Sequence, residues 1–212
     1  MRFKTLSIND TALFPEINQW DRRFSQNQCT IYGSAINLKY NCWINLTEDD
    51  LDIIANRMVD DWKLRLDSGA RGEDGVNYTY DYVREFAQDR WWKIPNLVIF
   101  KDYDLEKINE WLQRGYMLML GIRVNREFVK DARDGKIEKY EDYKNYQWKD
   151  LAHFTNVCIW KCRFSSEECE WFNKEMIVDS YAFNKKDREW IYECDIKELL
   201  EDIAMNTKYI FF

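Results

Sequence analysis

The chain has 212 residues, of which 46% are hydrophobic, 33% charged and 17% aromatic. This composition is typical of a soluble globular domain with a substantial core, and it excludes disordered and collagen-like chains. The net charge of −7 and the pI near 5.0 argue against a nucleic-acid partner held through its phosphates, and against adsorption to anionic membranes.

The first half of the chain predicts three helices. One begins at Cys29 and continues through small and apolar residues to Asn41. The second begins at Thr47, which opens a sequence like a capping box, and its apolar residues recur at helical spacing from 51 to 66. Residues 69–75 hold three of the seven glycines and predict a loop, and residues 76–90 predict the third helix.

The second half predicts mainly strands. Short apolar runs rich in β-branched and aromatic residues indicate strands at 97–100, 116–124, 153–164, 176–178, 190–192 and 209–212. Two helices are expected between them, at 105–114 before Gly115 and from Asp195 to about 205. Helices followed by strands indicate an α+β fold.

Cys29 is the first candidate for chemistry, because it stands where a helix would begin. The start of a helix offers unpaired N–H groups and the positive end of the helix dipole, and both stabilise a thiolate. Cys29 is therefore a candidate nucleophile. The alternative is a small buried residue at a helix end.

The chain supplies a single histidine, His153, which begins the strand predicted at 153–164. Any Cys-His chemistry therefore has one possible base. A carboxylate, Asp179, follows the next apolar run at 176–178. The order along the chain is cysteine, histidine, carboxylate.

In this order of motifs the chain resembles the papain-like cysteine peptidases. The matching motifs are QNQCT at 26–30, the histidine that begins a hydrophobic strand, and VDSYA at 178–182 in place of an Asn-Ser-Trp-Gly-like turn. The resemblance implies a single papain-like domain with a helical first lobe at roughly 21–92 and an antiparallel β second lobe at roughly 93–212. It places the active-site cleft between the two lobes.

Carried over residue by residue, the resemblance implies that Cys29 is the nucleophile and His153 its proton partner. Asp179, in the position of the family's asparagine, would orient the imidazole. The roles are chemically coherent, because an imidazolium stabilises a thiolate and later protonates the leaving group. Tyr181, in place of the family's tryptophan, would shield the hydrogen bond between Asp179 and His153.

The oxyanion-hole glutamine has two candidates. The family's glutamine usually lies six residues before the cysteine, where this chain has Arg23. Gln26 or Gln28 could take the role in a shortened loop, and Gln26 is preferred because Gln28 adjoins the nucleophile.

The substrate cleft is implied at the glycine-rich segment. By resemblance, the backbone of Gly72 to Gly75 would border the groove and pair with an extended peptide, whereas the alternative is an exposed connector. Aromatic residues before the histidine would form another wall or simply pack: Tyr143, Tyr146 and Trp148.

The preferred function is hydrolysis of a peptide or isopeptide bond in a protein or peptide substrate, without a cofactor. Acyl transfer or deamidation would use the same triad. A second hypothesis is an inactive papain-like module that binds a partner or serves as a structural part of a larger assembly, and the weak oxyanion lead-in and the short stretch before Cys29 favour it. A zinc site is a third, and the absence of a C-x-x-C pair argues against it; its ligands would be His153, Cys158, Cys162 and Cys169.

Location is inferred from what the chain lacks. No run reaches the ~20 apolar residues of a membrane-spanning helix, and residues 1–20 lack the pattern of a signal peptide. The six cysteines lack the spacing of a secreted disulfide framework. We therefore expect reduced thiols in a cytoplasmic protein, or in one inside a phage assembly, since the chain looks bacterial or phage-encoded.

Overall fold

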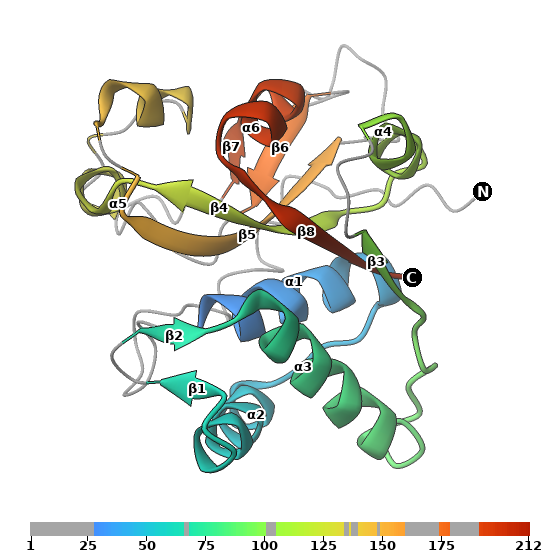
Figure 1. Cartoon of the computed structure of the whole chain (residues 1–212). Helices are drawn as coiled ribbons and strands as arrows, with labels where there is room; N and C mark the ends of the chain where they lie inside the picture. The colour runs from blue at the N-terminus through green and yellow to red at the C-terminus, as the bar shows by residue number, and fades with distance from the viewer. Residues whose placement is uncertain are drawn as a thin grey trace.

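A six-stranded antiparallel sheet is the centre of the computed structural model (Figure 1). The structure describes residues 28–65, 68–100, 105–133, 136, 140–147, 149–159, 174–178 and 191–212. The sheet's strands are β3 (Leu97–Phe100), β4 (Leu118–Val124), β5 (Leu151–Ile159), β6 (Glu175–Val178), β7 (Ile191–Glu193) and β8 (Ala204–Phe211). Their order across the sheet is β3-β8-β4-β5-β6-β7. A separate pair joins β1 (Leu64–Arg65) to β2 (Gly69–Ala70).

Helices cover both faces of the sheet. On one face lie α1 (Cys29–Cys42), α2 (Glu48–Asp60) and α3 (Gly72–Phe86). On the other lie α4 (Leu105–Gln113), α5 (Arg126–Arg133), α6 (Ile196–Asp202) and the short 3-10 helix η4 (Tyr140–Asn145). Figure 1 shows α1 along the sheet, with α2 and α3 on the far side of α1. The α+β class with an antiparallel sheet is thus confirmed.

Alternation along the strands divides the core in two. In β4, Leu118, Leu120 and Ile122 pack with the residues of α4, α5 and α6, and we call this side the α4–α6 face. Met119 and, in β5, Phe154 pack with α1, α2 and α3, and we call that side the α1 face. Because both faces are covered, β4, β5 and β6 are buried almost continuously rather than at every second residue.

Helix α1 begins at Cys29, as predicted, and ten of its 14 residues are buried. It lies between the sheet and the other two helices of its face, so apolar residues are needed on nearly its whole circumference. None of the helices in the described parts of the chain is long and apolar enough to cross a bilayer.

Helix α2 is shorter than its apolar spacing predicts. It stops at Asp60, and Trp62 adopts a left-handed conformation with φ 59°. The N–H of Lys63 then donates to the carbonyl of Met58 at 2.7 Å, which closes the helix in the manner of a Schellman motif. Trp43, after α1, and Trp91, beyond α3, are left-handed as well, with φ 62° and 56°. Glycine is the usual residue at such positions, so these tryptophans gave no stop signal.

Two segments are more helical than the sequence predicts. Helix α3 begins at Gly72, inside the segment predicted as a loop. Its first glycines permit close packing, since a Cβ atom at Gly72 would lie 3.0 Å from the ring of Phe154 and one at Gly75 would overlap Thr30. The polar segment at 125–152 contains α5 and η4, so the second half of the chain is more helical than expected.

Candidate functional site

Helix α1 and strand β5 run side by side in the same direction. Near the start of α1, the carbonyl of Gly33 accepts a hydrogen bond from Asn156 at 3.1 Å. One turn later Asn37 donates to Asn156, and near the end of the helix Tyr40 hydrogen-bonds to Cys158. The start of α1 therefore lies toward the start of β5, which brings Cys29 and His153 to the same end of the molecule.

The start of α3 joins them at this end. A Cβ atom added at Gly75 would overlap the hydroxyl of Thr30, and one added at Gly72 would lie 3.0 Å from the ring of Phe154. Thr30 follows Cys29, and Phe154 follows His153 in the sequence. Three elements far apart in the chain, each carrying a predicted site residue, thus begin at one place.

The first turn of α1 holds buried polar atoms without partners. Gln28, at the N-cap, is 1% exposed and makes no capping hydrogen bond with its side chain. Its Nε2, and the hydroxyl of the 2% exposed Thr30, have no hydrogen-bond partner in the part of the chain that the structure describes. Cys29 between them is partly accessible. A buried donor without a partner is destabilising and calls for an explanation, such as a ligand.

His153 is 2% exposed, and the strand register fixes its side. It stands opposite Ile122 of β4. Directly opposed residues point to the same face of a sheet, so His153 lies on the α4–α6 face with Ile122. Phe154 lies on the α1 face. His153 and the residues that contact α1 therefore leave β5 on opposite faces.

Three predicted site residues, Gln26, Asp179 and Tyr181, lie outside the described residues. The residue before Asp179 is described: Val178 ends β6 and pairs with Asn156 of β5. The strands predicted at His153 and at 176–178 are therefore found, and they are neighbours in the sheet.

The glycine-rich segment, predicted to be a loop that pairs with a peptide, is helical from Gly72 onward. Gly72 and Gly75 lie in the first turn of α3, and the N–H of Gly75 donates to the carbonyl of Arg71 at 3.1 Å. Gly75 is buried beneath Thr30. Its backbone is thus engaged in the helix, and it serves the packing of α3 on α1 rather than pairing with an extended peptide.

The ligands of the zinc hypothesis do not gather in the parts of the chain that can be described. Among those residues, no group of three or more histidine, cysteine or acidic side chains is placed to hold a metal ion. His153 and Cys158 point to opposite faces of β5, and burial raises the pKa of the Cys158 thiol to about 12. Cys162 and Cys169 lie outside the described residues.

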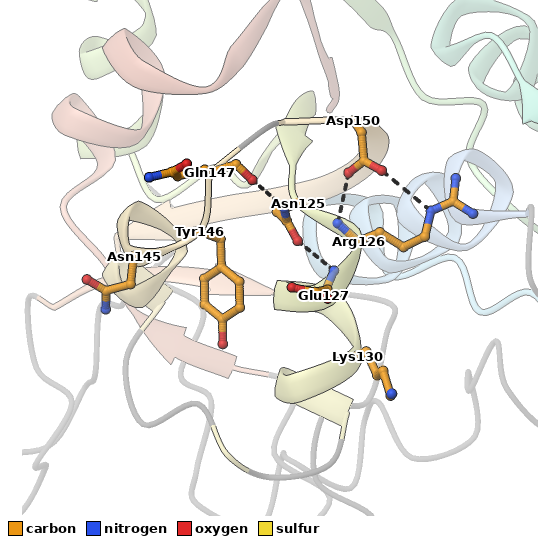
Figure 2. A pocket seen from close by; sticks show the side chains of 8 residues that line it. All are labelled: Asn125, Arg126, Glu127, Lys130, Asn145, Tyr146, Gln147 and Asp150. Carbon is orange, nitrogen blue, oxygen red and sulfur yellow. Dashed lines mark hydrogen bonds and ion pairs between the residues drawn. The ribbon is translucent and has the colours of Figure 1, made fainter.

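A surface pocket of about 790 Å³ lies between the start of α5 and the segment that leads into β5 (Figure 2). Its lining residues are Asn125, Arg126, Glu127, Lys130, Asn145, Tyr146, Gln147 and Asp150. Several of them bind one another: Asn125 donates to the carbonyl of Gln147, and the N–H of Arg126 donates to Asp150. The sequence indicated only Tyr146, which also packs on Phe128 at a ring distance of 5.5 Å. The pocket forms where the start of α5 and the segment before β5 pack together, and no local sequence pattern predicts that contact.

Comparisons with known proteins returned no match: no family model, no curated protein and no solved structure is significantly similar to this chain.

Proposed function

We propose that this chain is a papain-like, thiol-dependent hydrolase of peptide or isopeptide bonds, with its cleft where α1, α3 and β5 begin. The observation that carries the proposal is the start of α1, where Cys29 stands between Gln28 and Thr30, and the buried Nε2 of Gln28 and hydroxyl of Thr30 have no partner among the described residues. The nearness of the starts of α1 and β5 supports it, since the element that carries Cys29 and the strand that carries the chain's only histidine begin at the same end of the molecule.

The chemistry assigns one task to each residue of the triad. The Cys29 thiolate attacks the carbonyl carbon, so an S–C bond forms and the C–N bond breaks. His153 gives its proton to the leaving amine, and a water molecule then releases the acyl group with His153 as base. Asp179 orients the imidazole. An amine in place of water gives acyl transfer, and a side-chain amide as substrate gives deamidation.

Gln28 joins Gln26 as a candidate donor to the oxyanion. Its Nε2 is buried beside Cys29 and has no partner among the described residues, as expected of a donor whose partner is the transient negative oxygen. Donors preorganised in this way contribute about 10²–10³ in rate to acyl transfer.

A second candidate function is favoured by a different observation. The register places His153 with Ile122, away from the face that contacts α1, and leaves it 2% exposed. A chain in which the imidazole stays there has no base for Cys29. It would then be a papain-like module without turnover, which binds a partner or forms part of a larger assembly.

Thiol labelling separates the two functions, and α1 supplies its own control. Cys29 and Cys42 are the first and last residues of this helix and are both partly accessible, so they experience opposite ends of the helix dipole. We would react the protein with sub-stoichiometric iodoacetamide between pH 4 and 9 and quantify both sites by peptide mass spectrometry. The measurement would be repeated on His153→Gln, which keeps the size and polarity of this buried side chain.

For a hydrolase, Cys29 reacts well below pH ~8.5, at which an ordinary thiol is half ionised, while Cys42 does not. His153→Gln then removes this reactivity at low pH. Equal labelling of Cys29 and Cys42 at every pH, with no effect of His153→Gln, rejects the hydrolase and leaves the binding module.

A further inference from the structure

A network of buried amides joins α1 to the sheet. Asn156 of β5 donates to the carbonyl of Gly33 at 3.1 Å and accepts from Asn37 at 3.3 Å. Asn37 also donates to the carbonyl of Met117 at 2.8 Å. Its Oδ1 accepts from the N–H of Phe211 at 3.1 Å. One helix is thereby tied to three consecutive strands or their ends, in an interface that is otherwise apolar.

The network is complete at its centre. Asn37 uses both hydrogens of its amide, and its oxygen accepts a further bond from Asn41 at 3.0 Å. Both Asn37 and Asn156 are fully buried. Apolar contacts have no preferred direction, whereas hydrogen bonds in a dry interface fix one geometry and are costly to break. These amides therefore set the position of α1 along β5.

The link at Asn156 lies close to the proposed reacting groups. Gly33 is one helical turn after Cys29, and Asn156 is three residues after His153 on the same strand. The close approach needs glycine, because a Cβ at Gly33 would lie 2.8 Å from the ring of Phe154. A shift of α1 at this link moves Cys29 relative to the start of β5 directly.

We propose that Asn156 is a positioning residue, which sets the place of Cys29 relative to the start of β5, the strand that carries His153, by holding the first turns of α1 against that strand. This inference rests on the proposed hydrolase function. In this role Asn156 contacts neither the reacting thiol nor the imidazole. It acts through its hydrogen bond to the backbone of Gly33. A misplacement of about 1 Å between reacting groups costs on the order of 100-fold in rate.

The test compares Asn156→Leu with Asn41→Leu. Asn41 belongs to the same network, but its bonds join the last turn of α1 to Met117, at 2.9 and 3.0 Å, far from Cys29. Both variants lose hydrogen bonds between α1 and the sheet, so both lower the unfolding temperature. The readout that separates them is the rate of Cys29 alkylation across pH 4 to 9.

We expect Asn156→Leu to lower the Cys29 rate below pH 7 by at least about tenfold and to remove its dependence on His153. Asn41→Leu keeps the wild-type pH profile. Asn156→Val, which also lacks the donor to Gly33 and is a residue type that suits a strand, serves where the leucine variant does not fold and should show the same loss. Wild-type profiles in the Asn156 variants overturn the positioning role. If instead the wild-type protein itself shows no His153-dependent reactivity at Cys29, the hydrolase fails and this inference with it.

Discussion

Two helices of the same core, α1 and α2, begin in opposite ways. At α2 the hydroxyl of Thr47 accepts from the N–H of Asp50 at 3.3 Å, and the Asp50 carboxylate accepts from the N–H of Thr47 at 2.7 Å. Three acidic residues occupy this first turn. At α1 the N-cap Gln28 makes no such bond, no acidic residue is present in the first turn, and Cys29 is the first helical residue.

The difference indicates that the start of α2 stabilises the fold, whereas the start of α1 is suited to binding or catalysis. The start of α2 is closed by its own side chains, which satisfy its N–H groups and complement its dipole. At the start of α1, no side chain among the described residues caps the helix or complements its dipole. Violations of local rules tend to occur at functional sites and to be compensated elsewhere. The two helix starts should therefore respond to mutation with opposite signs.

The largest effect is expected at the closed start. Asp50 is 1% exposed and accepts two hydrogen bonds from Arg90 and one from the Tyr82 hydroxyl, all at 2.6 Å. Asp50→Ala removes the centre of this network and leaves the Tyr82 hydroxyl without its acceptor. We expect a loss of about 3–5 kcal/mol in the free energy of unfolding, measured with urea. Asp49→Asn, on the exposed side of the same turn, is the control and should change it by less than about 0.5 kcal/mol.

The same carboxylate predicts a pH dependence. Burial alone would raise the pKa of Asp50, but hydrogen bonds from Arg90, Tyr82 and Thr47 outweigh it and lower the pKa below its ordinary value. A carboxylate with a lowered pKa in the folded state stabilises above about pH 3.9, where it is ionised in the unfolded chain too, and this contribution is lost as the pH falls through the folded pKa. Asp50→Asn should flatten the decline of stability below pH 5. If the decline of stability below pH 5 is the same in Asp50→Asn as in the wild type, other carboxylates cause it.

The sequence predicts the capped start of α2, but it does not predict the residues that bind Asp50 from elsewhere in the chain. Thr47 followed by acidic residues predicts a capped helix, and the structure has one. Asp195 likewise caps α6 as predicted. These signals are local, since cap and helix are neighbours in the chain. Arg90, 40 residues from Asp50, joins the network only because α2 and α3 pack together.

At the start of α1, too, the sequence predicts the local elements of the candidate site but not how they meet. The helix start at Cys29 and the strand that carries His153 follow from local patterns. The side of the strand to which His153 points depends on its register with Ile122, and a shift by one residue would reverse it. The sequence shows that Gln28 precedes Cys29. It does not show that Gln28 is buried with its Nε2 lacking a partner among the described residues, because this depends on the packing around α1.

A smaller effect of the opposite sign is expected at Gln28. Gln28→Leu removes a buried amide donor that has no partner among the described residues and keeps a similar volume. We expect the free energy of unfolding to rise by about 1–2 kcal/mol, because the desolvation cost of that group disappears. The proposed oxyanion role predicts a simultaneous loss of reaction between Cys29 and a small aldehyde, whose adduct carries an oxygen like that of the tetrahedral intermediate. Alkylation by iodoacetamide, which forms no such oxygen, should persist. Lower stability in Gln28→Leu would mean that the amide is satisfied in solution.

The smallest effects should come from two buried threonines, of which one has a hydrogen-bond partner for its hydroxyl and the other has none among the described residues. Thr30, in the first turn of α1, has no partner for its hydroxyl among the described residues, whereas Thr79 of α3 donates to the carbonyl of Gly75 at 2.8 Å. Valine has nearly the same shape, so each substitution tests the hydroxyl alone. Thr79→Val should cost about 1 kcal/mol, and Thr30→Val should gain up to about 1 kcal/mol. Both residues contact the same Gly75, so differences in packing largely cancel between them. A loss at Thr30 as large as that at Thr79 would show that the start of α1 is as closed as that of α2, and the contrast between the two helices would no longer point to a ligand.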